Sequence, residues 1–279
     1  MQVLKEELCE LPRAPIPHSA LPPLIKWAGG KRWLLPYLLP LVAPYQGRRL
    51  VEPFAGSIAL ALAFRPQRAL LCDRNPHVMN FYRWVQRGFT LSVPMENDRD
   101  LYYAHRERFN QLIREGRGDS EEAALLFYYL NRTGYNGLCR FNRKGEFNVP
   151  FGKYRAIPYE RDFTPYRQLF KHWELLTGDF EALPLEEGDV LYLDPPYDVE
   201  FTSYTKESFG WEDQVRLAEW ARRHRGPVIL SNQATPRILA LYESCGFKIY
   251  TLWAPRRISC NGDRTKALEV LALRGLETY

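Results

Sequence analysis

The segment Val190-Leu191-Tyr192-Leu193-Asp194-Pro195-Pro196-Tyr197 is the stretch from which the fold can be worked out. Its first four residues form a short, continuous and β-prone apolar run, which is typical of a buried parallel strand. The two prolines end that strand, because neither has an N–H to donate to a neighbouring strand. Asp194 and Tyr197 are therefore expected at the strand's carboxyl end, where open α/β sheets bind their ligands. This segment thus combines a carboxylate, a stiff turn with free carbonyls and an aromatic ring. Such a combination is suited to binding a planar base through its exocyclic amine.

Similar strand-like runs recur along the chain, with helical patterns between them. The further runs are Arg49–Phe54, Ala69–Asp73, Trp173–Gly178, Pro227–Ser231, Lys248–Trp253 and Leu268–Leu273. The helical patterns are Ser57–Arg65, His77–Gln86 and Trp211–Arg223. This alternation predicts a doubly wound α/β sheet.

The strand pattern disappears between about Gly88 and Tyr166. Leu101–Arg114 and Ser120–Leu130 are helical in pattern there, and a basic loop follows them. We expect an inserted, mostly helical lobe. The predicted division is a flexible, proline-containing tail (1–20), a discontinuous α/β domain (21–75 and 161–279) and the inserted lobe (76–160).

The net charge of +5 is concentrated in that basic loop. Between Asn131 and Arg155 there are six lysines and arginines, against Glu146 as the only acid. Such a run is usually a solvated face. Here glycines, asparagines and aromatic residues are interspersed, as in loops that contact nucleic acid.

Composition excludes several classes of protein. The apolar and charged fractions, 46% and 25%, are those of a soluble globular chain. No apolar run is long enough to span a membrane, and acidic residues near the N-terminus argue against a signal peptide, so a cytoplasmic protein is expected. The five cysteines form no CxxC pair and the histidines are scattered, so neither a metal site nor a disulfide framework is predicted.

A second motif, Val51–Ser57, reads as a strand end, a small-residue turn and a helix start. Asp73 ends the next strand, seventeen residues after Gly56, about where an acid would accept ribose hydroxyls. Taken alone, a tight turn with a surface aspartate explains the pattern equally well. The glycine triplet of a dinucleotide site is missing.

Five blocks in one order resemble Dam-type DNA adenine methyltransferases, from about Leu24 to Leu273. They are 26–31 (KWAGGK), 52–54 (EPF), 131–142 (NRTGYNGLCRFN), 145–152 (GEFNVPFG) and 194–197 (DPPY). The resemblance implies a methyltransferase sheet with a target-recognition domain inserted after the second strand. It also implies S-adenosylmethionine as cofactor, double-stranded DNA as partner and N6-methyladenine as product.

The resemblance assigns roles to individual positions. The cofactor-binding positions are Trp27, Lys31, Phe54, Asp73 and Asp194. The DNA-reading positions, which imply GATC as the target, are Lys26, Tyr135, Asn136, Leu138, Arg140, Asn142 and Pro150. Arg140 is the candidate for a guanine edge, with a phosphate contact as the alternative.

The expected mechanism places Asp194, Pro195 and Tyr197 around the target base. The Asp194 carboxylate and the Pro195 carbonyl accept the two amine hydrogens, which localises the nitrogen lone pair toward the methyl donor. Tyr197 stacks on a base flipped out of the duplex. This chemistry needs no metal and no covalent intermediate. We also expect the protein to be a monomer.

Two features leave alternatives open. Ile58 stands where the family usually has a glycine, and its branched side chain could crowd the methionine part of the cofactor or mark a rearranged turn. Ser231-Asn232 could line the base pocket or simply end a strand. The competing functions are cytosine-N4 methylation and sequence-specific DNA binding without catalysis.

Overall fold

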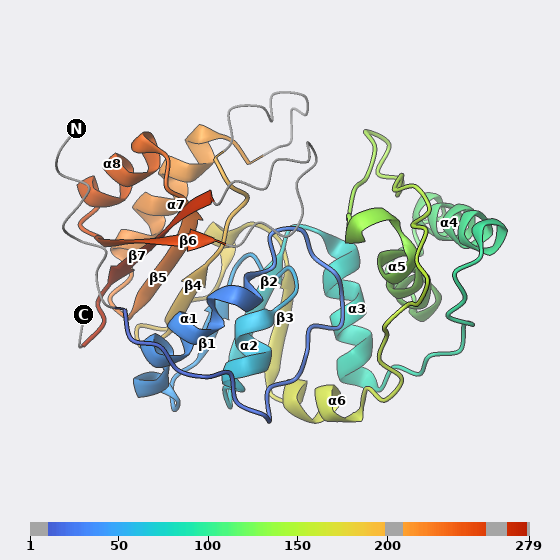
Figure 1. The fold of residues 1–279 in the computed structure, drawn as a ribbon, viewed down its shortest axis with the longest axis horizontal. Helices are drawn as coiled ribbons and strands as arrows, with labels where there is room; N and C mark the ends of the chain where they lie inside the picture. Colours follow the sequence, from blue (N-terminus) through green and yellow to red (C-terminus); the bar gives the residue numbers. More distant parts are fainter. Residues whose placement is uncertain (1–10, 199–208, 255–266, 278–279) are drawn as a thin grey trace.

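The structure, a computed structural model, describes residues 11–198, 209–254 and 267–277. A seven-stranded sheet in the order β3-β2-β1-β4-β5-β7-β6 lies at its centre (Figure 1). The strands are β1 (Leu50–Glu52), β2 (Ala69–Asp73), β3 (Trp173–Thr177), β4 (Val190–Leu193), β5 (Val228–Gln233), β6 (Lys248–Ala254) and β7 (Ala267–Arg274). All seven predicted strands are confirmed.

Strand order places a topological switch point between β1 and β4. β1 pairs in parallel with both β2 and β4, so the chain winds outward from β1 and then returns to its other side. β7 is antiparallel to β5 and to β6, a reversal that the apolar pattern did not predict. Ligands of open α/β sheets bind at such switch points, beyond the carboxyl ends of the strands. Asp194 follows β4 at that position.

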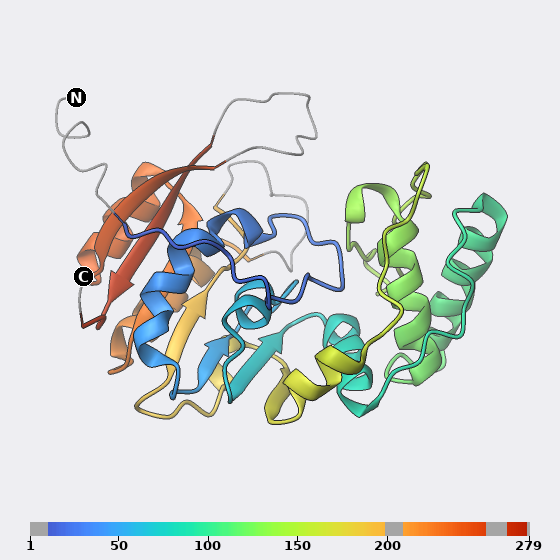
Figure 2. The same ribbon diagram turned by 60° about the horizontal axis from the view of Figure 1, so that its bottom comes forward.

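Helices cover both faces of the sheet (Figures 1 and 2). Along β4, Val190 and Tyr192 join one apolar cluster while Leu191 and Leu193 join the other, as the alternation of side chains in a strand requires. The helices of the first face are α1 (Leu35–Val42), α2 (Ala59–Phe64), α3 (Pro76–Arg87) and α6 (Thr164–Phe170); those of the second are α7 (Trp211–Arg223) and α8 (Pro236–Ser244).

Between α3 and α6 the chain forms the inserted lobe, which contains α4 (Arg99–Arg114) and α5 (Glu121–Thr133). The Asp98 and Ser120 side chains accept backbone N–H groups at the starts of these helices, as N-caps do. The lobe shares its core with the sheet domain: Phe81 of α3 stacks on Tyr128 of α5 with centroids 5.1 Å apart. The division of the chain at residues 76 and 160 stays a prediction.

Residues 11–20, the described part of the expected flexible tail, lie against the sheet domain. Leu11 is buried, the Ala14 N–H donates to the Pro36 carbonyl at 2.9 Å, and Arg65 donates to the Ser19 carbonyl at 2.9 Å. These contacts hold this stretch of backbone in one place. Residues 1–10 lie outside the described part of the chain.

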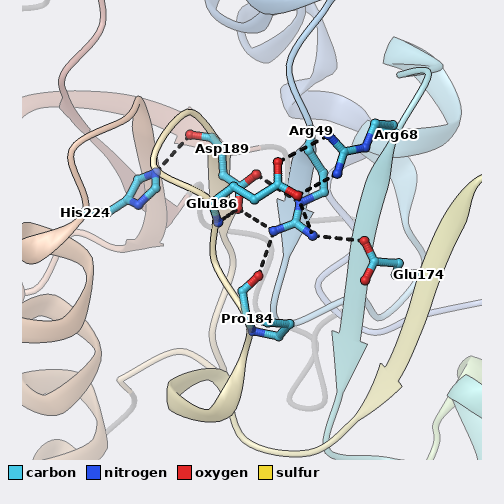
Figure 3. Close-up of polar contacts among 7 residues, drawn as sticks. All are labelled: Arg49, Arg68, Glu174, Pro184, Glu186, Asp189 and His224. Carbon is cyan, nitrogen blue, oxygen red and sulfur yellow. Dashed lines mark hydrogen bonds and ion pairs between the residues drawn. The ribbon is translucent and has the colours of Figure 1, made fainter.

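At the amino ends of the parallel strands, an ion-pair network around the buried Arg49 joins several segments (Figure 3). Arg49, 4% exposed, donates through Nε to Asp189 at 2.9 Å and through a terminal nitrogen at 2.8 Å. It also binds the Pro184 carbonyl at 2.7 Å and Glu174 at 2.9 Å. Because almost every donor of a buried guanidinium is used, its desolvation is compensated. The network thus lies at the opposite end of the strands from Asp194, which follows the carboxyl end of β4.

Candidate active site

Asp194, Lys31 and Ser231 meet at the carboxyl end of β4. The Lys31 ammonium lies 2.9 Å from Asp194 Oδ1, and the Ser231 hydroxyl donates to the same oxygen at 2.8 Å. Lys31 also donates to the Gly29 carbonyl at 2.8 Å. No hydrogen bond or ion pair to Asp194 Oδ2 is present within the described ranges. The two contacts with Oδ1 orient the carboxylate.

The Tyr197 side chain is held by Lys31 and Glu269. Lys31 Nζ lies 4.4 Å from the ring centroid, and the phenol donates to Glu269 Oε2 at 2.5 Å. Burial, and then the charges of Asp194 and Glu269, raises the pKa of Tyr197 well above its ordinary value, so the phenol keeps its proton and donates it. Glu269, on β7, was not predicted as a site residue. The sequence signal was a single acid within the apolar strand.

Buried amides hold the proline turn from behind. Gln214 of α7 donates to the Pro196 carbonyl at 2.8 Å, and Asn232 donates to Gln214 at 3.0 Å and to the Tyr242 hydroxyl at 3.0 Å. Asn232 has no exposed surface, so it supports the turn and does not line a pocket. The Pro195 carbonyl has no such donor in the part of the chain that the structure describes.

The predicted cofactor-binding turn brings Asp73, Gly56 and Trp27 together. The backbone N–H groups of Gly56 and Asn75 each donate to one oxygen of the Asp73 carboxylate, at 2.9 Å. Burial raises the pKa of Asp73, and these two bonds oppose the shift. Gly56 has φ +46°, and a Cβ there would lie 2.6 Å from Trp27 Nε1. Only glycine allows the indole to approach so closely.

Phe54 lies apart from Trp27 and Lys31, in the apolar cluster of the opposite face. Its ring centroid is 5.8 Å from that of Phe180 and 5.5 Å from that of Phe209. The ring is half-buried. Its placement beside the turn supports the backbone of β1 and leaves one part of the side chain accessible.

Ile58 adopts left-handed backbone angles, φ +48° and ψ +36°, just before α2. A β-branched residue is strained there, by about 1–2 kcal/mol, whereas the glycine that the resemblance leads us to expect would not be. The side chain is 1% exposed and belongs to the main apolar cluster. This packing favours the second of the two alternatives, a rearranged turn.

Glu52 of β1 is fully buried below the same turn. Its carboxyl accepts the Ala61 N–H at 2.8 Å and so caps α2, whose N-cap residue Ile58 has no polar side chain. Burial, and to a smaller extent the Asp194 charge, raises the pKa of Glu52 to about 8 against the opposing Ala61 bond. Glu52 therefore carries a proton at neutral pH.

The basic loop folds back on itself as a hairpin, residues 134–151. Isolated bridges pair Gly134 with Phe151 and Phe141 with Phe147. The hairpin rises on the side of the molecule to which the parallel strands point (Figures 1 and 2). Four of the predicted DNA-reading residues are exposed on it, namely Tyr135, Asn136, Arg140 and Pro150. The Tyr135 ring is 50% exposed, which is unusual for an aromatic side chain.

Arg140, although exposed, donates through Nε to Asn148 Oδ1 at 2.8 Å. The remaining predicted DNA-reading residues are partly buried and have structural contacts. Lys26 donates to the Arg132 carbonyl at 2.8 Å, and burial, followed by the Arg132 charge, lowers its pKa to about 8. The Asn142 amide oxygen accepts the N–H groups of Lys144 and Glu146, which forms the hairpin turn. Leu138 is half-buried against the main apolar cluster. These three contacts shape the hairpin and its base.

No helix within the described residues is long and apolar enough to cross a membrane. Nor do three or more histidines, cysteines and acids gather anywhere in the described ranges in a way that could hold a metal ion.

Comparison with known proteins agrees with the motifs. The family model for D12 class N6 adenine-specific DNA methyltransferases matches residues 27–258. The retron Ec67 DNA adenine methylase of Escherichia coli is 34% identical over 272 residues, covering 92% of each chain. The DNA adenine methylase of Salmonella typhi is 36% identical over 277 residues, covering 89% of this chain and 94% of that one.

The DNA N-6-adenine-methyltransferase of Escherichia phage P1 is 35% identical over 270 residues, and the match covers 90% of this chain but 35% of the phage protein. These matches favour adenine N6 over cytosine N4, and an enzyme over a DNA-binding protein without catalysis. The family and the sheet together imply S-adenosylmethionine as the methyl donor. The chain belongs to the D12 class of N6 adenine-specific DNA methyltransferases.

Proposed function

We propose that the protein methylates the adenine of GATC in duplex DNA after rotating that base out of the helix. The observation that carries the proposal is the orientation of Asp194. Lys31 and Ser231 both bind Oδ1, which directs Oδ2 toward an incoming amine hydrogen. The Pro195 carbonyl is the acceptor for the second hydrogen. The hydrogen bond from Gln214 to the Pro196 carbonyl holds the turn in position.

These two acceptors make the exocyclic nitrogen a better nucleophile. In free adenine its lone pair is delocalised into the ring. With both hydrogens bonded to Asp194 and Pro195, the lone pair is localised on the nitrogen and directed away from the acceptors. Hydrogen bonds to an ionised carboxylate are about twice as strong as neutral ones.

Trp27, Lys31 and Asp73 are the residues proposed to hold the methyl donor. The fit rests on Asp73, whose two oxygens are fixed by backbone N–H groups, and on the Gly56 turn, where the absence of a side chain lets the Trp27 indole lie against the backbone. S-adenosylmethionine, when bound, supplies an electrophilic methyl group. Asp73 would accept hydroxyls of its ribose, and Trp27 would present the edge of an apolar wall beside Gly56.

Base flipping is proposed because an amine inside a duplex cannot reach Asp194. Extrusion costs a few kcal/mol. Stacking on an aromatic ring returns about 1–3 kcal/mol per base, and Tyr197 lies beside Asp194 with its ring already fixed. The exposed hairpin residues Tyr135 and Arg140 are proposed to contact the bases next to the target.

In the test, unmethylated DNA is incubated with the protein and S-adenosylmethionine and then digested with two nucleases. One nuclease cuts GATC only when its adenine is unmethylated, and the other cuts it only when the adenine is methylated. We expect protection from one nuclease and sensitivity to the other. Asp194→Ala should abolish the change while DNA binding and the circular dichroism spectrum stay as in the wild type. Asp119→Ala, at an exposed position of the lobe, is the matched control. Turnover by Asp194→Ala at the wild-type rate would refute the mechanism, and methylation outside GATC would refute the site.

A further inference from the structure

We propose that Glu269 of β7 is a positioning residue for methyl transfer, which accepts a hydrogen bond from the Tyr197 hydroxyl and fixes the position of the ring on which the extruded adenine stacks. The inference rests on the proposed function, in which Tyr197 is that stacking ring. Glu269 itself touches neither DNA nor cofactor in this account. It acts through Tyr197.

The first argument is the number of points at which the ring is held. A tyrosine side chain turns about two bonds, and stacking on a base requires both to be fixed. Tyr197 is fixed at its hydroxyl by Glu269 at 2.5 Å and at one ring face by the Lys31 ammonium at 4.4 Å. Because the hydroxyl oxygen lies on the axis of the Cβ–Cγ bond, the Glu269 bond fixes the rotation about Cα–Cβ, and the Lys31 contact with one ring face favours one orientation of the ring plane.

The second argument is the rigidity of the support. Glu269 lies opposite Gln233 of β5 on one side and Leu252 of β6 on the other, so the strand that carries it is bonded into the sheet on both sides. Tyr197, by contrast, lies in the turn after β4. The bond therefore ties a turn residue to a strand that is hydrogen-bonded on both of its edges, 72 residues further along the chain.

The third argument is chemical. The strand sequence Leu268-Glu269-Val270-Leu271 is apolar except for the acid, and a carboxylate in such a place is costly unless it is bonded. Burial raises the pKa of Glu269, whereas Lys31 and the Tyr197 bond oppose that shift. The Lys31 charge, which forms an ion pair with Asp194, thus also favours the ionised form of Glu269.

A double-mutant cycle tests the proposal, with Glu269→Leu, Tyr197→Phe and the combination. Single-turnover methylation is measured at saturating S-adenosylmethionine, and base extrusion is followed by the fluorescence of 2-aminopurine at the target position of a GATC duplex. Each single variant should lower the transfer rate by about 10- to 150-fold, the range for a hydrogen bond to a charged group. The double variant should be no slower than the slower single, since both changes remove the same bond.

Glu269→Gln provides the rescue, because its amide oxygen still accepts from the phenol. We expect its transfer rate to fall by about 4- to 13-fold, a smaller loss than in Glu269→Leu, since about half of the strength of the bond is lost with the charge. The dissociation constant for S-adenosylmethionine should be unchanged in Tyr197→Phe and in Glu269→Gln. Should Glu269→Leu fail to fold, Tyr197→Phe and Glu269→Gln decide the matter, because both are close in shape to the residues they replace.

Three outcomes would overturn the proposal. Losses that multiply in the double variant would mean that Glu269 does not act through Tyr197. A wild-type rate in Tyr197→Phe would mean that the bond has no role in transfer. If the wild-type enzyme gives no increase in 2-aminopurine emission, base flipping itself is wrong, and the role of Glu269 is wrong with it. The first two outcomes, by contrast, leave the proposed function intact.

Discussion

Replacing Ser231 with alanine removes one of the two groups that orient Asp194. Ser231 has no exposed surface, and its hydroxyl donates to Asp194 Oδ1 at 2.8 Å with the Tyr192 hydroxyl 3.3 Å away. A hydrogen bond to a charged group contributes about 1.5–3 kcal/mol. If the bond is needed in the transition state, the rate should fall by about 10- to 150-fold, at 1.36 kcal/mol for each factor of ten.

The assay for Ser231→Ala is single-turnover transfer of a labelled methyl group to a GATC duplex, with saturating enzyme and cofactor. Binding of DNA and of S-adenosylmethionine should change less than threefold, because Ser231 is not proposed to contact either. Ser244→Ala, at the exposed end of α8, is the control. A Ser231→Ala enzyme that transfers at the wild-type rate would refute the reasoning, since Lys31 alone would then suffice to orient the carboxylate.

Three further changes test other parts of the structure. Arg140→Ala should relax the choice at one base position by about 1–3 kcal/mol, measured with duplexes substituted at each position of GATC, whereas an equal loss on all duplexes would indicate a phosphate contact. Asp189→Ala should lower the free energy of unfolding in urea by about 3–5 kcal/mol because it leaves Arg49 buried without its main partner; a loss below 1 kcal/mol, as expected for Glu187→Ala at the exposed pair with Arg225, would contradict this. Glu52 has its folded pKa raised to about 8, so the native state keeps a proton that the unfolded state releases, and stability should fall as the pH rises from about 5 to 8. Glu52→Gln should flatten that decline in urea titrations at several pH values, and an unchanged slope would show that Glu52 does not cause it.

The strands could be predicted because each is a short apolar run with a clear end. Their directions could not, since hydropathy has no direction, and the reversal of β7 between β5 and β6 went unpredicted. Helix α1 was missed because Pro36 and Pro40 interrupt its pattern; Pro36 is tolerated in the first turn, where a backbone N–H has no partner in the helix.

Within the site, Asp194 and Tyr197 could be placed from the strand end that precedes them. Glu269 could not, because its partner is distant in sequence and only the folded sheet brings the two together. From the sequence alone, Ser231 and Asn232 could either line the base pocket or simply end a strand. In the structure their contacts differ, because Ser231 donates to Asp194 whereas Asn232 donates to Gln214 on α7. Neighbouring strand residues point to opposite faces, so adjacent positions can serve different purposes.

The apolar cluster that runs without a break from the sheet through Phe81 and Tyr128 into the inserted lobe has a mechanical consequence. A shared core of this kind opposes movement of the lobe as a separate body. Under the proposed function, the spacing between the hairpin and Asp194 would then be set before DNA binds, and the duplex would undergo the larger deformation to bring an adenine to the carboxylate.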